Sequence, residues 1–191
     1  MRTSRSDRIQ LTLLQQAPLL LFAAVFVVFG VLEPSFLRPQ TLELIAYQAT
    51  FTGILAVGMT FVLLTAGIDL SVGATMYVAA VVMGELLGAD SPLLLALLVC
   101  LAVGLLFGLV NGAIIARVGV VAFVVTLATL FVGRGLGVFV SGSRAVQFPD
   151  SVLDFAAARV PTGIWDVPAP ILVFAAVVAV AHLVLTRTTF G

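Results

Sequence analysis

The sequence predicts an all-α fold: a polytopic integral membrane protein built as a bundle of about six transmembrane helices. Of the 191 residues, 62% are hydrophobic and only 9% are charged, whereas a soluble domain carries about 25% charged residues. The hydrophobic residues form six long runs, and a transmembrane helix needs roughly 20 mostly apolar residues. Prolines and polar residues gather between these runs. We therefore expect a single transmembrane domain over residues 1–191.

The predicted spans follow the apolar runs, at about 15–32, 45–66, 72–88, 93–116, 121–140 and 169–186. Pro18, Pro92, Pro168 and Pro170 fall at helix starts, and no proline interrupts a predicted span. The first run is longer than the apolar core of a cleaved signal peptide, about 7–15 residues. It therefore predicts an uncleaved span after an N-terminal tail, 1–14. The third run is short, so the second and third could instead form one broken helix around residues 67–73.

The basic residues, all of them arginine, favour a cytoplasmic N-terminus. With that orientation the inner segments hold Arg2, Arg5, Arg8, Arg117 and Arg187, and the outer segments hold Arg38, Arg144 and Arg159. An excess of positive charge on the inner side is the usual pattern. The C-terminus is then also inside.

The one long polar segment, residues 141–168, is expected outside as an external loop. Asp150 or Ser151 could cap a short amphipathic helix running through Arg159. Its apolar side chains, Val152, Leu153 and Phe155, would rest on the membrane surface, and Trp165 would lie in the interfacial aromatic belt. The loop is either a solvated lid or a docking surface for an external partner.

A polar stretch, residues 65–73 (TAGIDLSVG), interrupts two apolar runs. A carboxylate at the centre of a membrane helix costs roughly 2.5–3.5 kcal/mol, so Asp69 should lie at an interface, in a cavity or beside a partner. In one interpretation Asp69 and Ser71 only cap the next helix, by accepting hydrogen bonds from its free N–H groups. In the other, the charge of Asp69 has a role in a polar pathway.

Arg134 lies well inside the fifth apolar run and needs a partner. It could pair with Asp69, cap backbone carbonyls, snorkel to the outer interface, or line a polar pathway. Gly133, Gly135 and Gly137 surround it, which indicates a kink or a close helix contact there.

The fourth run carries Gly104, Gly108 and Gly112 at four-residue spacing, on one stripe with Asn111 beside it. Small residues let membrane helices approach closely. We expect this stripe to be a helix-packing face.

Catalytic chemistry finds little support in the sequence. His182 is the single histidine and Cys100 the single cysteine, and both stand in apolar runs. No spacing typical of metal ligands occurs, so no metal site is expected. The chain has no lysine, which excludes the usual phosphate-binding loop. We therefore expect no enzyme activity, and any nucleotide chemistry must come from a separate subunit.

Residues 56–73 (AVGMTFVLLTAGIDLSVG) closely resemble the signature of the permease subunits of ribose/xylose-type ABC sugar importers. The resemblance continues in residues 112–116, in residues 123–127 with Arg134 and Gly135, and in residues 186–191. It covers nearly the whole chain from Pro34 onward. Ala66 is a mild departure, because the family often has glycine or serine there. Members of that family continue far beyond this point, so the sequence resembles the N-terminal part of a permease.

The resemblance implies a membrane-spanning subunit that forms the translocation path of an ATP-driven monosaccharide importer in the bacterial inner membrane. Its implied partners are a second permease subunit, as a homodimer, a cytoplasmic ABC ATPase, an external sugar-binding protein and membrane lipids, with no nucleic acid. This chain would bind no cofactor, and ATP-Mg would lie on the ATPase. The candidates for substrate translocation or gating are Asp69, Ser71, Thr126 and Arg134. A secondary carrier or channel, with Asp69 and Arg134 as coupling charges, and a non-functional permease fragment are the alternatives.

Overall fold

The computed structural model describes residues 5–163 and 166–188, with side chains from residue 14 onward except that of Ser151. The elements are α1 (Arg5–Leu32), α2 (Pro39–Leu64), α3 (Val72–Gly88), α4 (Leu93–Ala113), the π-helical turn η1 (Ile114–Val118), α5 (Ala122–Ser141), α6 (Asp150–Ala156), β1 (Arg159–Pro161), β2 (Asp166–Pro168) and α7 (Ala169–Arg187). The predicted all-α, polytopic fold is confirmed, since two three-residue strands are its only β-structure in the described part of the chain.

Five segments of the described chain are long and apolar enough to cross a membrane: Leu14–Leu32, Pro39–Leu64, Leu93–Val118, Ala122–Ser141 and Ala169–Arg187. The sixth predicted span is α3, which has only 17 residues. At 1.5 Å per residue it is about 26 Å long, shorter than the roughly 30 Å hydrocarbon core. α3 is therefore an apolar helix that does not meet the length of an independent span.

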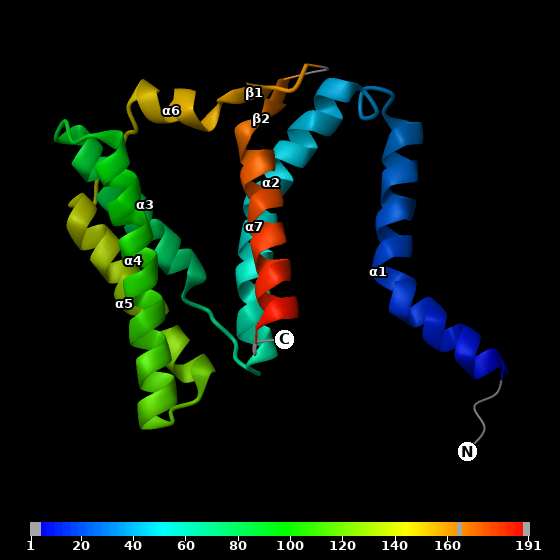
Figure 1. The fold of residues 1–191 in the computed structure, drawn as a ribbon, viewed down its shortest axis with the longest axis horizontal. Coiled ribbons are helices and arrows are strands. Elements are labelled where there is room, and N and C mark those ends of the chain that lie inside the picture. The colour runs from blue at the N-terminus through cyan, green and yellow to red at the C-terminus, as the bar shows by residue number, and fades with distance from the viewer. Residues whose placement is uncertain (1–4, 164–165, 189–191) are drawn as a thin grey trace. The chain divides into compact units, whose positions relative to one another are not determined.

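The chain divides into two compact units, Met1–Ala49 and Thr50–Gly191. In the first unit, Pro18 lies inside α1 and not at its start, because the helix already begins at Arg5. The prediction that Pro18 falls at a helix start is therefore wrong. Proline removes a backbone hydrogen bond and bends a helix, and α1 changes direction along its length (Figure 1).

After α1 the chain turns at Glu33. The Glu33 carboxylate accepts hydrogen bonds from the hydroxyl and the backbone N–H of Ser35, at 2.6 and 3.3 Å. These bonds favour the charged form and lower the pKa of Glu33. The ring of Phe36 stacks edge-on against Phe26, with centroids 5.1 Å apart, which holds the turn against α1.

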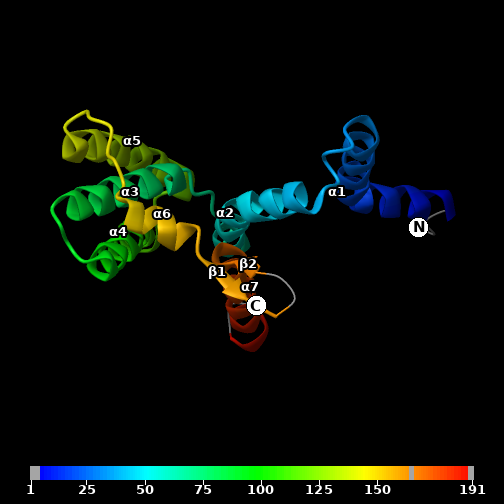
Figure 2. The same ribbon diagram turned by 90° about the horizontal axis from the view of Figure 1, so that it is seen from above.

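The second unit contains a three-helix bundle of α3, α4 and α5, seen from above in Figure 2. α3 is its central element and supplies most of the buried apolar side chains: Ala74, Val78, Ala79, Val81, Met83 and Leu87. A helix that is apolar on every face is buried by its neighbours. This burial explains how so short a helix is held within the bundle.

The α3–α5 contact is made through glycines. A Cβ on Gly133 would lie 2.9 Å from the Cβ of Ala74, and one on Gly137 would collide with the ring of Tyr77. The close contact predicted around Arg134 is therefore confirmed at these two positions. Gly135 faces open space.

The predicted loop, residues 141–168, contains more structure than expected. Its helix, α6, ends at Ala156, short of Arg159, and the N-cap residue is Pro149, so neither Asp150 nor Ser151 is the capping residue. Val152 packs against Met83, Leu87 and Ala96 of the bundle, so it does not rest on a membrane surface as expected.

The rest of the loop is a hairpin, β1–β2, with Val160 opposite Val167. Valine favours strands, and Gly163 takes the positive φ of +85° in the turn. The hairpin leads directly into α7. Trp165, predicted at the interface, lies outside the described residues.

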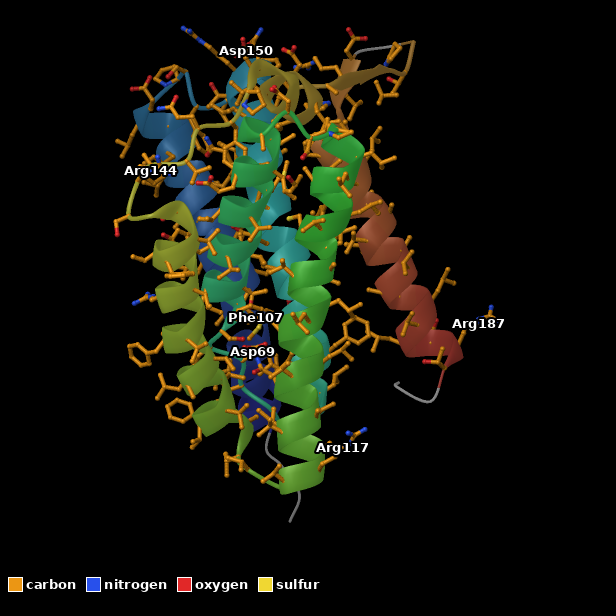
Figure 3. All side chains as sticks on the ribbon, turned by 90° about the vertical axis from the view of Figure 1, so that its left-hand side faces the viewer. Asp69, Phe107, Arg117, Arg144, Asp150 and Arg187 are labelled. Carbon is orange, nitrogen blue, oxygen red and sulfur yellow. The ribbon has the colours of Figure 1, made fainter. Side chains whose placement is uncertain are left out.

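α7 lies along the second half of α2, where Gly53 leaves room for the ring of Phe174. Arg144 and Asp150 lie in the upper part of the second unit, and Arg117 and Arg187 lie lower (Figure 3). This agrees with the grouping of the arginines expected from the sequence.

Candidate functional site

The candidate site is built around residues 65–71, a non-helical segment between α2 and α3. α2 runs down to its end in Figure 1, and the chain then turns back and climbs before α3 begins part-way up the bundle. The two helices thus run in opposite directions. The alternative of one broken helix, which would keep its direction, is wrong.

α2 ends in a left-handed turn. The N–H of Gly67 donates to the carbonyl of Val62 at 3.1 Å, and the N–H of Ala66 donates to Leu63 at 2.9 Å. This pair of bonds is the Schellman pattern, which needs a residue with positive φ just after the helix. That residue is Ala66, with φ +55°. Glycine is favoured there because a Cβ costs about 1–2 kcal/mol in this conformation.

Asp69 forms a tight turn with Ser71. Its Oδ1 accepts hydrogen bonds from the N–H of Ser71 at 2.7 Å and from the Ser71 hydroxyl at 2.6 Å. Ser71 is the N-cap residue of α3, yet its side chain makes no capping hydrogen bond; its hydroxyl donates to Asp69 and accepts from Asn111. The prediction that both side chains accept from N–H groups within the helix is therefore wrong: Asp69 instead fixes the residue at which α3 begins.

Asn111 of α4 joins this turn from 40 residues away. Its side-chain amide donates to the Ser71 hydroxyl oxygen at 3.0 Å. Both side chains are buried, with 2% of Ser71 and 4% of Asn111 exposed. The Oδ1 of Asn111 is buried and has no hydrogen-bond partner in the described part of the chain. The sequence pattern places Asn111 beside the glycine stripe and predicts no contact with Ser71, although an amide in an apolar run is itself a signal of an interhelical hydrogen bond.

Thr126 of α5 holds the segment from the other side. Its hydroxyl lies 3.0 Å from the carbonyl of Ile68 and 2.9 Å from that of Ala122 in its own helix. A hydroxyl has one proton to donate, and Thr126 is 2% exposed, so this bond is shielded from solvent. Asp69, Ser71 and Thr126 are thus brought together. With Asn111, these side chains form a group that we call the clamp.

The clamp lies within the depth of the bundle. Asn111 precedes the end of the α4–η1 span, Val118, by seven residues, which is about 10 Å of helix. Figure 3 shows Asp69 at this level, between Phe107 and Arg117. Irregular backbone at membrane depth is tolerated where it is buried in protein or lines a water-filled cavity. Within the segment Gly67 and Ser71 are buried, whereas Thr65, Ala66 and Ile68 are exposed.

Arg134, the fourth predicted site residue, stands apart from the clamp. No ion pair joins it to Asp69 in the part of the chain that the structure describes, so the proposed pairing is not formed. Its side chain is exposed and lines a cavity of about 480 Å³ between α3 and α5, together with Gly73, Ala74, Tyr77, Leu130 and Val138.

The glycine stripe on α4 has no neighbour in the described chain. A Cβ on Gly104, Gly108 or Gly112 would meet nothing within 4 Å. The helices of this chain therefore do not use the stripe, and its predicted role in helix packing remains a prediction for contact with another polypeptide.

Catalytic and metal-binding groups are not assembled. No group of three His, Cys, Asp or Glu side chains gathers among the described residues. His182 lines a separate cavity of about 210 Å³ between α2 and α7, with Thr60 as the other polar side chain. The arrangement of the site is suited to holding a polar turn inside a membrane bundle.

Comparison with known proteins places this geometry in context. A family described as "Branched-chain amino acid transport system / permease component" matches residues 41–191. The ribose import permease protein RbsC of Haemophilus influenzae is 32% identical over 182 residues, which cover 94% of this chain and 56% of that protein.

Two further relatives carry a different name. The autoinducer 2 import system permease protein LsrC of Salmonella typhi is 35% identical over 173 residues, covering 91% of this chain and 49% of the relative. LsrD of Klebsiella pneumoniae is 33% identical over 184 residues, covering 93% and 54%. The chain spans about half the length of these curated relatives, and no solved structure matches it.

Proposed function

Because the chain belongs to the family of branched-chain amino acid transport system / permease components, we propose that it is a membrane-spanning permease subunit of an ATP-binding-cassette importer for monosaccharides. Membership of this family and the match to the ribose import permease confirm the resemblance predicted from residues 56–73. The observation that supports a sugar as the transported substrate is the set of relatives. They are named for ribose and autoinducer 2 import and not for amino acids.

The proposed importer needs other polypeptides. The chain would work with a second permease subunit, a cytoplasmic ABC ATPase that binds ATP-Mg, and an external sugar-binding protein. The permease supplies the path and its conformational change, and ATP hydrolysis resides on the ATPase. This chain itself would bind no cofactor and catalyse no reaction.

The clamp supports a gating role for the segment that precedes α3. A backbone segment fixed by the side chains of two helices, at membrane depth, has a limited number of alternative arrangements. Asp69, Ser71 and Thr126 would hold this segment, and Arg134 would face the path.

The test is uptake by lipid vesicles that contain the permease with its ATPase and binding protein. We expect labelled D-ribose to accumulate only when ATP is supplied to the ATPase, and L-leucine to stay outside. Accumulation of leucine alone would replace the sugar with an amino acid as cargo. Accumulation driven by an ion gradient without ATP would favour a secondary carrier.

The proposed location is the bacterial inner membrane, with the N-terminus cytoplasmic. In a Cys100→Ser background, a membrane-impermeant thiol reagent should label Ala145→Cys from outside the cell and Arg117→Cys only after the membrane is opened. These positions flank opposite ends of α5. The reverse labelling would invert the orientation and leave the cargo proposal unaffected.

A further inference from the structure

The guanidinium of Arg134 has an unusual setting. Arg134 lies 12 residues after Ala122, the first residue of α5, and thus about 18 Å along the helix. Its side chain is exposed and forms no hydrogen bond or ion pair with the described residues of the chain. A charged side chain facing hydrocarbon at this depth costs roughly 2.5–3.5 kcal/mol. Something polar must therefore meet it.

The cavity beside Arg134 has the size and the walls of a binding site. Its volume of about 480 Å³ falls within the roughly 300–1,000 Å³ of small-molecule pockets. The two helices that form the cavity wall are packed closely, because Gly133 and Gly137 of α5 contact Ala74 and Tyr77 of α3. Tyr77 is 38% exposed, so it can offer both a ring and a hydroxyl.

The positive charge and the N–H donors around the cavity favour a ligand with oxygen atoms. Gly73 and Ala74, in the first turn of α3, line the same cavity, and the unpaired N–H groups of a first turn carry partial positive charge. The guanidinium adds five N–H donors. A ligand rich in hydroxyl oxygens satisfies these donors, whereas an acyl chain does not.

A carboxylate from a second copy is a weaker candidate for the partner of Arg134. Among the residues whose side chains the structure describes, the carboxylates other than Asp69 lie close to helix ends or in the connecting segments: Glu33, Glu43, Glu85, Asp90, Asp150, Asp154 and Asp166. Asp69 is already engaged with Ser71. The side chain of Asp69 is thus held in its own turn through Oδ1.

We propose that the cavity defined by Gly73, Ala74, Tyr77, Leu130, Arg134 and Val138 is a water-filled subsite for a neutral, polyhydroxylated substrate. Arg134 donates hydrogen bonds to the substrate's hydroxyl oxygens, and the ring of Tyr77 packs against its apolar face. This inference rests on the proposed function and assigns the substrate-contacting surface to Arg134 and Tyr77. Ser71 and Thr126 are too buried to touch substrate.

Two glycines provide a matched pair of variants. A Cβ on Gly73 or on Gly135 meets nothing within 4 Å, and neither glycine has a left-handed backbone. Both therefore accept a larger residue equally well, but only Gly73 lines the cavity. In vesicles, we expect Gly73→Val to lower the maximal rate of D-ribose uptake at least tenfold, and Gly135→Val to leave it within twofold. Equal rates for the two variants would overturn the proposal.

A labelling experiment gives a reading that does not depend on transport. In a Cys100→Ala background, a water-soluble thiol reagent should modify Gly73→Cys quickly and Gly135→Cys slowly, and excess D-ribose should slow the reaction at Gly73→Cys. An unreactive Gly73→Cys would show that the cavity is dry and would overturn the proposal. Protection by inorganic phosphate and not by D-ribose would make it an anion site, which also overturns it.

The two experiments separate the two proposals. If the unsubstituted protein fails to import ribose with ATP while D-ribose still protects Gly73→Cys, the proposed function is wrong and the subsite stands. If ATP-driven uptake is normal and Gly73→Val matches Gly135→Val, the function stands and the subsite is wrong. Arg134→Gln, which removes the charge without filling the cavity, should lower the uptake rate as Gly73→Val does.

Discussion

Asn111 and Ser71 share a single buried hydrogen bond, 3.0 Å long, that joins α4 to the start of α3. The bond uses one side of the Asn111 amide and leaves its buried Oδ1 without a partner in the described chain. A buried acceptor with no donor costs about 1–3 kcal/mol. The contact therefore contains a stabilising part and a destabilising part on one side chain.

This imbalance predicts an unequal pair of mutants. Asn111→Leu removes the bond and the unpaired oxygen together, so we expect the free energy of unfolding to change by less than about 1 kcal/mol. Ser71→Ala leaves both ends of the amide unpaired and should lower the free energy of unfolding by about 1–3 kcal/mol. Denaturant titration in detergent measures both, with the double variant completing the cycle. A larger loss for Asn111→Leu would contradict the prediction.

Two substitutions separate the role of Asp69 in holding the turn from any role of its charge. Asn in its place keeps an Oδ1 that can accept both hydrogen bonds from Ser71, so Asp69→Asn should unfold at nearly the native temperature. Asp69→Leu removes the acceptor and should cost about 1–3 kcal/mol. Thermal unfolding compares the two. If ribose uptake also survives in Asp69→Asn, the side chain serves only the turn, and its charge has no part in gating.

Ala66 offers a stabilising change. Because its φ is +55°, Ala66→Gly should raise the free energy of unfolding by about 1 kcal/mol. The control is Ala113→Gly, at φ −65° in a helix, which should lower it by about 0.5–1 kcal/mol. Effects of the same sign at both positions would show that the end of α2 does not need a left-handed residue.

The α3–α5 contact should distinguish two glycines that are two residues apart. Gly137→Ala places a methyl group against the ring of Tyr77, whereas Gly135→Ala points into open space. We expect Gly137→Ala to destabilise the protein by about 1–3 kcal/mol and Gly135→Ala to stabilise it by roughly 0.5–1 kcal/mol. Melting temperatures decide the matter, and loss of stability in both would argue against the observed packing.

Gly108 tests whether another polypeptide uses the α4 stripe. Gly108→Leu meets no atom of the described chain, so a monomer should tolerate it. If a second subunit packs on the stripe, the substitution should lower the fraction of assembled complex in analytical ultracentrifugation. Leu106→Ile, off the stripe, is the control. Assembly unaffected by Gly108→Leu would end the packing interpretation.

The helices themselves were predictable because hydropathy and proline placement report on local properties. The ends of α3, α5 and α7 differ from the predicted spans by one residue at most. The start of α2 at Pro39 was missed, because Glu43 made the first helical turn look like a connecting segment, although proline is favoured at a first helical position. The β1–β2 hairpin was missed for a similar reason: strands of three residues leave no periodic pattern.

The site was predictable only in part. The sequence indicates Asp69, Ser71 and Thr126, but not the bond from Asn111 to Ser71, because no local pattern connects residues 40 positions apart. The two glycine series show the same limit. Gly104, Gly108 and Gly112 have the stronger spacing, but Gly133 and Gly137 make the contact within this chain. Glycine spacing shows that one helix face can approach another helix closely. It does not show which helix packs against that face.

The position of residues 65–71 also constrains the order of events during synthesis. The partners that fix this segment, Asn111 and Thr126, are made 40 and 58 residues after Ser71 and Ile68. When α3 first leaves the ribosome, the turn before it has its internal bonds between Asp69 and Ser71 but not the contacts from Asn111 and Thr126. The turn can reach its native conformation only after α4 and α5 have been inserted. We therefore expect the native insertion of α3 to depend on α4 and α5.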